Sequence, residues 1–161
     1  MSIIIKPMET DEEIRGKAFV HWRSWQEAYR GIVDQAYLDA LTLDKCLEIA
    51  FRWKENILIA FDEGNVVGFA GYGNCTDEDL SDAGELFALY VLPEYYGTGL
   101  GCRLTDAALS NLKQSKIVLT VLKNNPRAIR FYEKYGFRPD GTEKTVKLGS
   151  PVLTIRMILT K

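Results

Sequence analysis

The segment Phe87-Ala-Leu-Tyr-Val-Leu-Pro-Glu-Tyr-Tyr-Gly-Thr-Gly-Leu-Gly101 holds the features that decide the fold. An apolar run ends at Pro93, a glycine-rich turn follows, and a helix is predicted after it over Cys102–Gln114. Glycines between a buried strand and a helix let a ligand approach the backbone, and the first amides of the helix have no partners of their own. Because the helix dipole adds positive charge there, the segment predicts a site for a phosphate or pyrophosphate.

Two familiar phosphate-binding motifs do not fit this segment. A Walker loop ends in Gly-Lys-Ser/Thr, whereas Gly101 is followed here by Cys102 and Arg103. A Rossmann fingerprint that starts at Gly97 requires glycine or alanine at Cys102, and its acidic partner strand is missing. On this segment alone, a tight turn without a ligand remains an open interpretation.

A second segment, Asn125-Pro-Arg-Ala-Ile-Arg-Phe-Tyr-Glu-Lys-Tyr-Gly-Phe137, follows the next predicted strand, Lys116–Leu122. That strand is almost continuously apolar, as expected of a strand covered on both faces. Asn125 before Pro126 predicts a helix N-cap, and Gly136 predicts the end of the helix.

Together, the two segments resemble the GNAT acetyltransferase superfamily. The first is similar to the family's Arg/Gln-x-x-Gly-x-Gly/Ala motif, and the second is similar to Asn-x-x-Ala-x-x-Phe-Tyr-x-x-x-Gly-Phe. Both occur in the family's order, and with their flanking strands they cover residues 56–138. More loosely, Trp25–Gly31 resembles a branch of small bacterial members. Tyr96 departs from the pattern, because the family usually has Arg or Gln at that position.

The resemblance implies an α/β GNAT-like fold in a single domain over residues 1–161. We expect a mixed, mostly antiparallel sheet of about six to seven strands, about four helices, and two splayed parallel strands that hold acetyl-CoA. Thr10 and Glu13 form a predicted capping box. The expected strands are Ile3–Lys6, Asn56–Phe61, Asn65–Tyr72, Glu85–Leu92, Lys116–Leu122, Thr142–Leu148 and Val152–Thr160. The expected helices run from Thr10 to Gly31, over 34–53 with a break near Thr42–Asp44, over Cys102–Gln114 and from Pro126 to Gly136.

By resemblance, acetyl-CoA is the co-substrate and enters between Leu89–Leu92 and Val118–Leu122. An amide near Leu89 or Tyr90 then polarises the thioester carbonyl, and the Asn125 side chain bonds the pantetheine arm. The positions carried over for cofactor binding are Leu89, Tyr90, Val91, Gly97, Thr98, Gly99, Leu100, Gly101, Cys102, Asn125, Ala128, Phe131, Tyr132 and Lys134.

Two residues take catalytic roles by resemblance. Tyr132 aligns with a tyrosine that protonates the departing thiolate in many relatives, although it also fits as a core aromatic of an amphipathic helix. Glu85 begins the strand where related enzymes often place a carboxylate that acts through water. A solvated acid at the end of the strand, continuous with the acidic loop Thr76–Asp82, is its alternative interpretation.

The acceptor is predicted to be the primary amine of a small molecule, polyamine-like or similar, acetylated directly in a ternary complex. Trp25, Tyr29 and Glu85 are the expected contacts, although aromatic residues at helical spacing also fit a core. The acidic loop Thr76–Asp82 favours a cationic amine. A peptide or protein acceptor remains open. A non-catalytic acyl-CoA-binding regulatory domain also remains open: Tyr96 favours it, whereas Glu85 and Tyr132 oppose it.

The composition of the 161 residues, with 47% apolar and 26% charged, is that of a soluble globular protein. A net charge of −2 without a basic run predicts no nucleic-acid partner. Cys46, Cys75 and Cys102 form no Cys-x-x-Cys pair, and His21 is a lone histidine expected to be structural, so reduced thiols and no metal are predicted. The apolar runs are too short for a signal peptide or membrane span, which predicts no membrane partner and a cytoplasmic location. A homodimer that pairs through Thr142–Thr160 is implied by resemblance alone.

Overall fold

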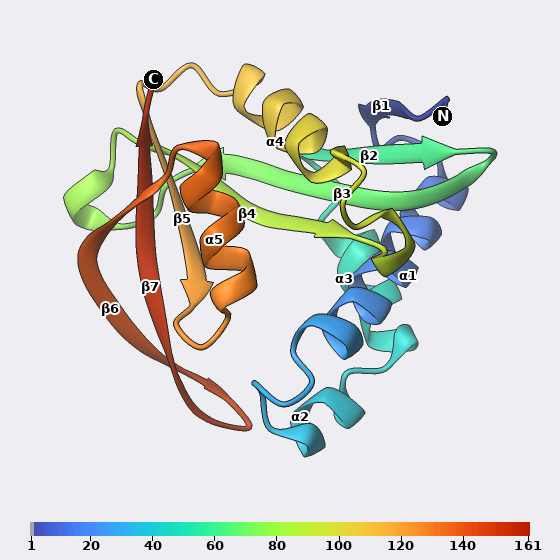
Figure 1. Ribbon diagram of the computed structural model, residues 1–161. Helices are drawn as coiled ribbons and strands as arrows, with labels where there is room; N and C mark the ends of the chain where they lie inside the picture. Colours follow the sequence, from blue (N-terminus) through green and yellow to red (C-terminus); the bar gives the residue numbers. More distant parts are fainter. Residues whose placement is uncertain (1) are drawn as a thin grey trace.

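The computed structural model describes residues 2–161, which form one seven-stranded sheet and five α-helices (Figure 1). The strand order is β1-β2-β3-β4-β5-β7-β6, and all neighbours are antiparallel except β4 and β5. The predicted mixed, mostly antiparallel sheet is therefore confirmed. The strands are β1 (Ile4–Pro7), β2 (Ile57–Asp62), β3 (Asn65–Asn74), β4 (Gly84–Val91), β5 (Lys116–Leu122), β6 (Arg138–Leu148) and β7 (Ser150–Thr160). The helices are α1 (Asp11–Ala28), α2 (Gln35–Ala40), α3 (Leu43–Arg52), α4 (Leu100–Ser110) and α5 (Pro126–Tyr135), with short 3-10 turns η1 (Glu78–Leu80) and η2 (Pro93–Tyr95).

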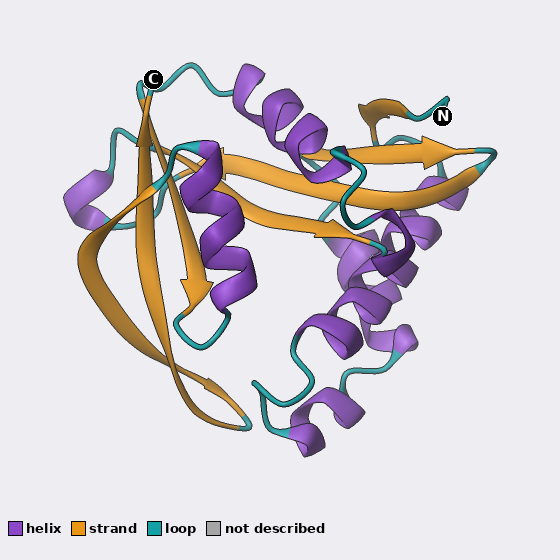
Figure 2. Ribbon diagram, viewed as in Figure 1, coloured by secondary structure: helices purple, strands orange, loops and turns teal. Residues whose placement is uncertain are grey.

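The parallel strands β4 and β5 pair only at their beginnings. Their register consists of Gly84 opposite Ile117 and Glu85 opposite Val118. In contrast, β5 and β7 pair along the whole length of β5. Figure 2 shows the β1–β4 half of the sheet diverging from the β5–β7–β6 half. The predicted splayed pair is thus present.

Helices cover both faces of the β1–β4 half. Helices α1 and α3 pack together on one face, and α4 covers the other (Figure 1). Gly16 of α1 lies so close to β3 that a Cβ atom there would be 2.5 Å from Cγ2 of Val66. On the α4 side, a Cβ at Gly68 would be 3.0 Å from Cδ1 of Leu104, a side chain that is completely buried. These close approaches hold α1 and α4 against opposite faces of β3, the strand next to β4.

The N-terminal helices differ in number from the prediction. Residues 34–53 form two helices, α2 and α3, so there are five α-helices in residues 2–161 where about four were expected. Thr42 causes the separation, because its hydroxyl accepts a bond from the Lys45 amide at 3.2 Å and caps α3. The capping box is confirmed: the Thr10 hydroxyl accepts from the Glu13 amide at 3.1 Å, and the Glu13 carboxylate accepts from the Thr10 amide at 3.0 Å.

Two strand features bear on the predictions. Strand β3 has a bulge between Gly71 and Tyr72. Strand β6 begins at Arg138, four residues before the predicted start at Thr142. The first residues of β6 are exposed and are followed by a register shift before Glu143. They therefore show no alternation of apolar and polar residues from which a strand could be predicted.

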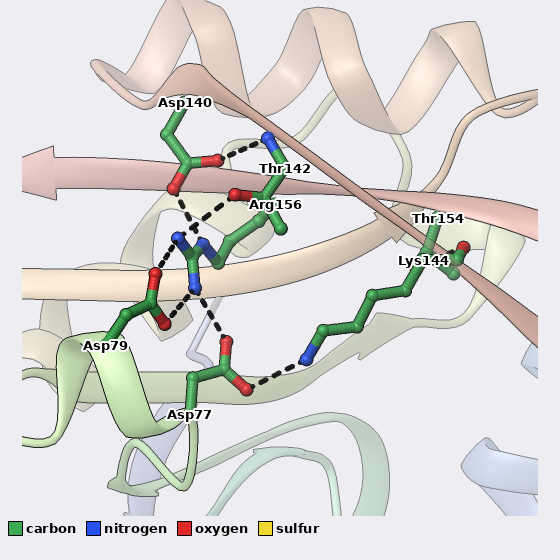
Figure 3. Close-up of polar contacts among 7 residues, drawn as sticks. All are labelled: Asp77, Asp79, Asp140, Thr142, Lys144, Thr154 and Arg156. Atoms are coloured by element: carbon green, nitrogen blue, oxygen red, sulfur yellow. Dashed lines mark hydrogen bonds and ion pairs between the residues drawn. The ribbon is translucent and has the colours of Figure 1, made fainter.

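An ion cluster around one buried arginine joins the loop before β4 to the β6–β7 hairpin (Figure 3). The guanidinium of Arg156 on β7, with only 8% of its side chain exposed, lies 3.0 Å from Asp77, 2.7 Å from Asp79 and 2.6 Å from Asp140. Lys144 makes a second ion pair with Asp77 at 3.1 Å. Two carboxylates of the acidic loop predicted from the sequence are therefore paired with cations of the same chain.

Cys46 and Cys75 are buried and Cys102 is exposed, and all three are free thiols. Across residues 2–161, no helix has both the length and the apolar character needed to cross a membrane.

Candidate active site

A cleft of about 820 Å³ opens where the two halves of the sheet separate. Its walls are β4 from Leu86 to Val91, β5 from Leu119 to Leu122, the turn into α4, helix α5 and the C-terminal end of α1. The cleft therefore joins the two segments that carry the sequence motifs.

The cleft exposes backbone groups that a closed sheet would pair. In the described part of the chain, Leu86 to Val91 have β3 as a partner on one side but no β5 partner on the other. A row of unpaired amides and carbonyls along one wall can bind an extended chain of amide groups.

The glycine turn leads into an uncapped helix N-terminus. Gly97 and Gly99 have φ values of 77° and 85°, in the left-handed region that favours glycine. Gly99 occupies the N-cap position of α4 and provides no side-chain cap. At Gly101, a Cβ atom would lie 3.2 Å from the Phe131 ring, so glycine also allows α4 and α5 to approach. The Leu100 amide donates to Thr98 Oγ1 at 3.4 Å, and the other first amides of α4 have no partner within the helix, so this turn is able to bind an anion.

An aromatic–cation pair stands beside the anion site. The guanidinium of Arg127 lies 3.6 Å from the ring centroid of Tyr96, and both residues line the cleft. Tyr96 therefore supports a cation contributed by the second motif, although it is itself neither Arg nor Gln. No local pattern predicts this pair, because the two residues are 31 positions apart in the sequence.

Tyrosine side chains gather at the centre of the cleft. The hydroxyls of Tyr29 and Tyr90 are hydrogen-bonded at 3.0 Å, and the Tyr29 ring packs edge-on against Trp25 at 4.7 Å. Burial, with a further contribution from Tyr29, raises the pKa of Tyr132 far above its usual range, so this phenol is protonated at neutral pH. A protonated phenol facing the cleft is able to donate a proton.

Helix α5 presents its motif residues to the cleft from a capped start. Asn125 Oδ1 accepts a bond from the Ala128 amide at 3.2 Å, which confirms the predicted N-cap. This bond leaves the two Nδ2 protons of Asn125 free to act as donors. Phe131 and Lys134 lie along the same wall.

Glu85 lies next to the cleft rather than in its wall, because the lining of β4 begins at Leu86. Its carboxyl is half-buried, and burial together with the neighbouring charge of Asp77 raises its pKa. The bulge between Gly71 and Tyr72 lies opposite this part of β4, and sequence alone does not show how such a bulge redirects side chains.

The structure brings most of the predicted site residues together. Glu85, Thr98 and the buried Leu100 stand outside the lining. The predicted residues that line the cleft are Trp25, Tyr29, Leu89, Tyr90, Val91, Gly97, Gly99, Gly101, Cys102, Asn125, Ala128, Phe131, Tyr132 and Lys134.

This fold and cleft are those of an acetyltransferase. Residues 19–137 match the model of the Acetyltransferase (GNAT) family, and the chain belongs to that family. It is similar to the uncharacterized N-acetyltransferase YuaI of Bacillus subtilis, with 34% identity over 132 residues that cover 77% of this chain and 74% of the relative. It is also similar to the spermine/spermidine N(1)-acetyltransferase of Bacillus subtilis, with 36% identity over 86 residues that cover 49% of this chain and 57% of the relative.

Solved structures agree with this fold. The PaiA N-acetyltransferase of Thermoplasma acidophilum, in complex with coenzyme A, aligns with a TM-score of 0.77 and 25% identity over 100% of both chains. The protein yncA of Salmonella typhimurium, with its cofactor acetyl-CoA, aligns with a TM-score of 0.73 and 18% identity over 99% of this chain and 94% of that one. The chain is thus an enzyme of the N-acetyltransferase type.

Proposed function

We propose that this enzyme transfers the acetyl group of acetyl-CoA directly to the primary amine of a small molecule in a ternary complex. The observation that supports the proposal most is the separation of β4 from β5 beside the uncapped N-terminus of α4. One continuous cleft there offers amide partners for an extended chain and an anion site at its end. Acetyl-CoA supplies the activated acyl group as a thioester.

The pyrophosphate is assigned to the turn from Gly97 to Gly101. The free amides of α4 bind it, and the guanidinium of Arg127, supported by the Tyr96 ring, adds the side-chain hydrogen-bond donor that Arg or Gln at position 96 usually provides in the family. The Nδ2 group of Asn125 is assigned to the pantetheine arm.

The chemistry is assigned to β4 and Tyr132. A backbone amide at Leu89 or Tyr90 donates a hydrogen bond to the thioester carbonyl oxygen and stabilises the charge that develops on it. The amine nitrogen bonds to the carbonyl carbon as the carbon–sulfur bond breaks, and the Tyr132 hydroxyl donates its proton to the sulfur. The proton that the amine loses passes through water to Glu85, and a proton from solvent restores the Tyr132 hydroxyl.

Glu85 is assigned the role of a base that acts through water. Its place beside the cleft leaves room for a water molecule, and its raised pKa makes it a stronger base than an exposed carboxylate.

The predicted assembly belongs to the same proposal. Residues 1–161 form one N-acetyltransferase domain that acts in the cytoplasm, and two copies pair through the β6–β7 hairpin, where Val146 is 36% and Leu153 45% exposed. Light scattering after size exclusion at micromolar concentration should give twice the mass of the chain. A monomer there refutes the pairing.

Titration calorimetry with acetyl-CoA, followed by a thiol-release assay on a panel of amines, tests the proposed activity. We expect micromolar binding and release of CoA with one class of small amine. The panel includes polyamines, because the spermine/spermidine relative supports a small amine, and peptides with a free N-terminus. No binding of acetyl-CoA refutes the proposal, and turnover of peptides alone moves the acceptor to the peptide class.

A further inference from the structure

A second pocket, of about 670 Å³, adjoins the cleft on the α1 side of β4. It lies between α1, the segment after α3 and the strands β3 and β4. Four residues line both hollows: Trp25, Phe87, Ala88 and Tyr90. A molecule in the second pocket can therefore extend toward the centre of the cleft.

Lys17 is a buried cation in the wall of this pocket. Only 5% of its surface is exposed, and its ammonium lies 4.8 Å from the ring centroid of Phe69. In residues 2–161 its ammonium makes no ion pair and no hydrogen bond to a protein atom. Burial lowers the pKa of Lys17, which is the expected effect on a cation without an anion beside it. Buried charges in proteins are ordinarily paired with an opposite charge, and the described residues provide none for Lys17. A bound anion would complete the pair.

His21 follows Lys17 by one helical turn and also lines the pocket. Its Nδ1 atom is buried without a hydrogen-bond partner within residues 2–161. Burial and the charge of Lys17 lower the pKa of His21 to about 4, so the imidazole is neutral at pH 7. A neutral imidazole beside an ammonium provides a second polar contact without adding a charge.

The remaining lining makes the pocket both cationic and aromatic. Arg52 and Lys54 add positive charge at its edge, and Glu55 adds the one negative charge among its lining residues in the described chain. Arg52 is already paired with Glu48 at 3.1 Å. Three large apolar side chains of the lining are exposed: Ile49 by 36%, Trp53 by 66% and Phe87 by 53%.

We propose that this pocket binds the distal end of the acceptor, and that the acceptor is an amine bearing a carboxylate at the far end of an apolar spacer. Lys17 pairs with the carboxylate, the aromatic rings cover the spacer, and the amine reaches the cleft beside Tyr90. The assignment rests on the proposed acetyl transfer, and it names the substrate class. At a rise of 1.5 Å per residue, Lys17 lies roughly 6 Å from His21 and roughly 12 Å from Trp25 along the axis of α1. The spacer between the carboxylate and the amine must therefore be several bonds long. A polyamine would bring a second cation to Lys17, which is unfavourable.

Acceptors of matched length test the charge requirement. We expect kcat/KM for 6-aminohexanoate to exceed that for hexylamine at least tenfold, and 1,6-diaminohexane to be the poorest of the three. Equal values, or a preference for the diamine, overturn the carboxylate assignment while leaving acetyl transfer intact.

Lys17→Met tests the residue, with Lys113→Met, an exposed lysine outside both hollows, as the matched control. Lys17→Met should reduce the preference for 6-aminohexanoate over hexylamine at least tenfold, and Lys113→Met should keep the wild-type preference. Titration calorimetry of 6-aminohexanoate into the free protein measures the pocket without turnover: we expect weaker binding to Lys17→Met than to wild type. Equal binding to both overturns the pocket, whereas failure of acetyl-CoA to bind overturns the proposed function instead.

Discussion

Arg127→Ala tests the cation that replaces the usual side chain of the glycine motif. The guanidinium is held 3.6 Å above the Tyr96 ring at the mouth of the cleft. A hydrogen bond to a charged group contributes about 1.5–3 kcal/mol, and about 1.4 kcal/mol corresponds to a tenfold change in affinity. We therefore expect Kd for acetyl-CoA to rise roughly 10- to 150-fold.

Titration calorimetry at two salt concentrations is the assay. Arg130→Ala is the matched control, because Arg130 is exposed on the same helix but does not line the cleft. Arg130→Ala should change Kd less than twofold. The defect of Arg127→Ala should shrink at high salt, since screening weakens the lost attraction in the wild type.

Tyr96→Ala separates support from direct contact. If Tyr96 acts by holding Arg127, the double substitution should weaken binding no more than Arg127→Ala alone. Additive losses would show that Tyr96 contacts the ligand by itself. A Kd for Arg127→Ala within twofold of the wild type would refute the reasoning, because the anion site would then need no side-chain cation.

Four further predictions concern turnover and stability. Tyr132→Phe should lower kcat at least tenfold and leave the Kd of acetyl-CoA nearly unchanged; loss of binding in calorimetry would assign the residue to packing. Because burial raises the pKa of Glu85, wild-type kcat/KM should fall as the pH drops through that pKa, and an unchanged pH–rate profile in Glu85→Gln would remove this base. Arg156→Met should lower the urea midpoint of unfolding, because three partly exposed carboxylates lose the cation that they share, and an unchanged midpoint would contradict this. Burial opposes ionisation of Glu13, but the hydrogen bonds from Lys6 and two backbone amides lower its pKa to about 2. The stability that the Glu13 carboxylate contributes should therefore be complete above pH 4.5 and be lost as the pH falls toward 2. Glu13→Gln should flatten the dependence of the free energy of unfolding on pH over this range.

The predictable parts of the fold were those carried by neighbours in sequence. The capping box of Thr10 and Glu13, the cap at Asn125 and the glycine turn depend on contacts across a few residues. The two motifs placed most of the cleft lining for the same reason, because each is one continuous turn or helix.

The features that sequence did not supply depend on distant contacts. The bond between Tyr29 and Tyr90 joins residues 61 positions apart, and Arg127 meets Tyr96 from another helix. Asp77 and Asp79 of the acidic loop pair with Arg156 far along the chain, so part of the loop's negative charge is neutralised within the protein. Local patterns contain no information on such pairs, since folding brings them together through the sheet.

The short ladder between β4 and β5 has a consequence for hydrogen exchange. Two residue pairs hold the halves of the sheet together at this seam, so the amides of β4 beyond Glu85 that face β5 lack the protection of a neighbouring strand. In the proposed binding mode, the pantetheine arm takes the place of that strand and completes the hydrogen bonding across the seam. Exchange at these amides should therefore slow most when the donor is bound, and the sheet reaches its full rigidity only in the complex that carries out the reaction.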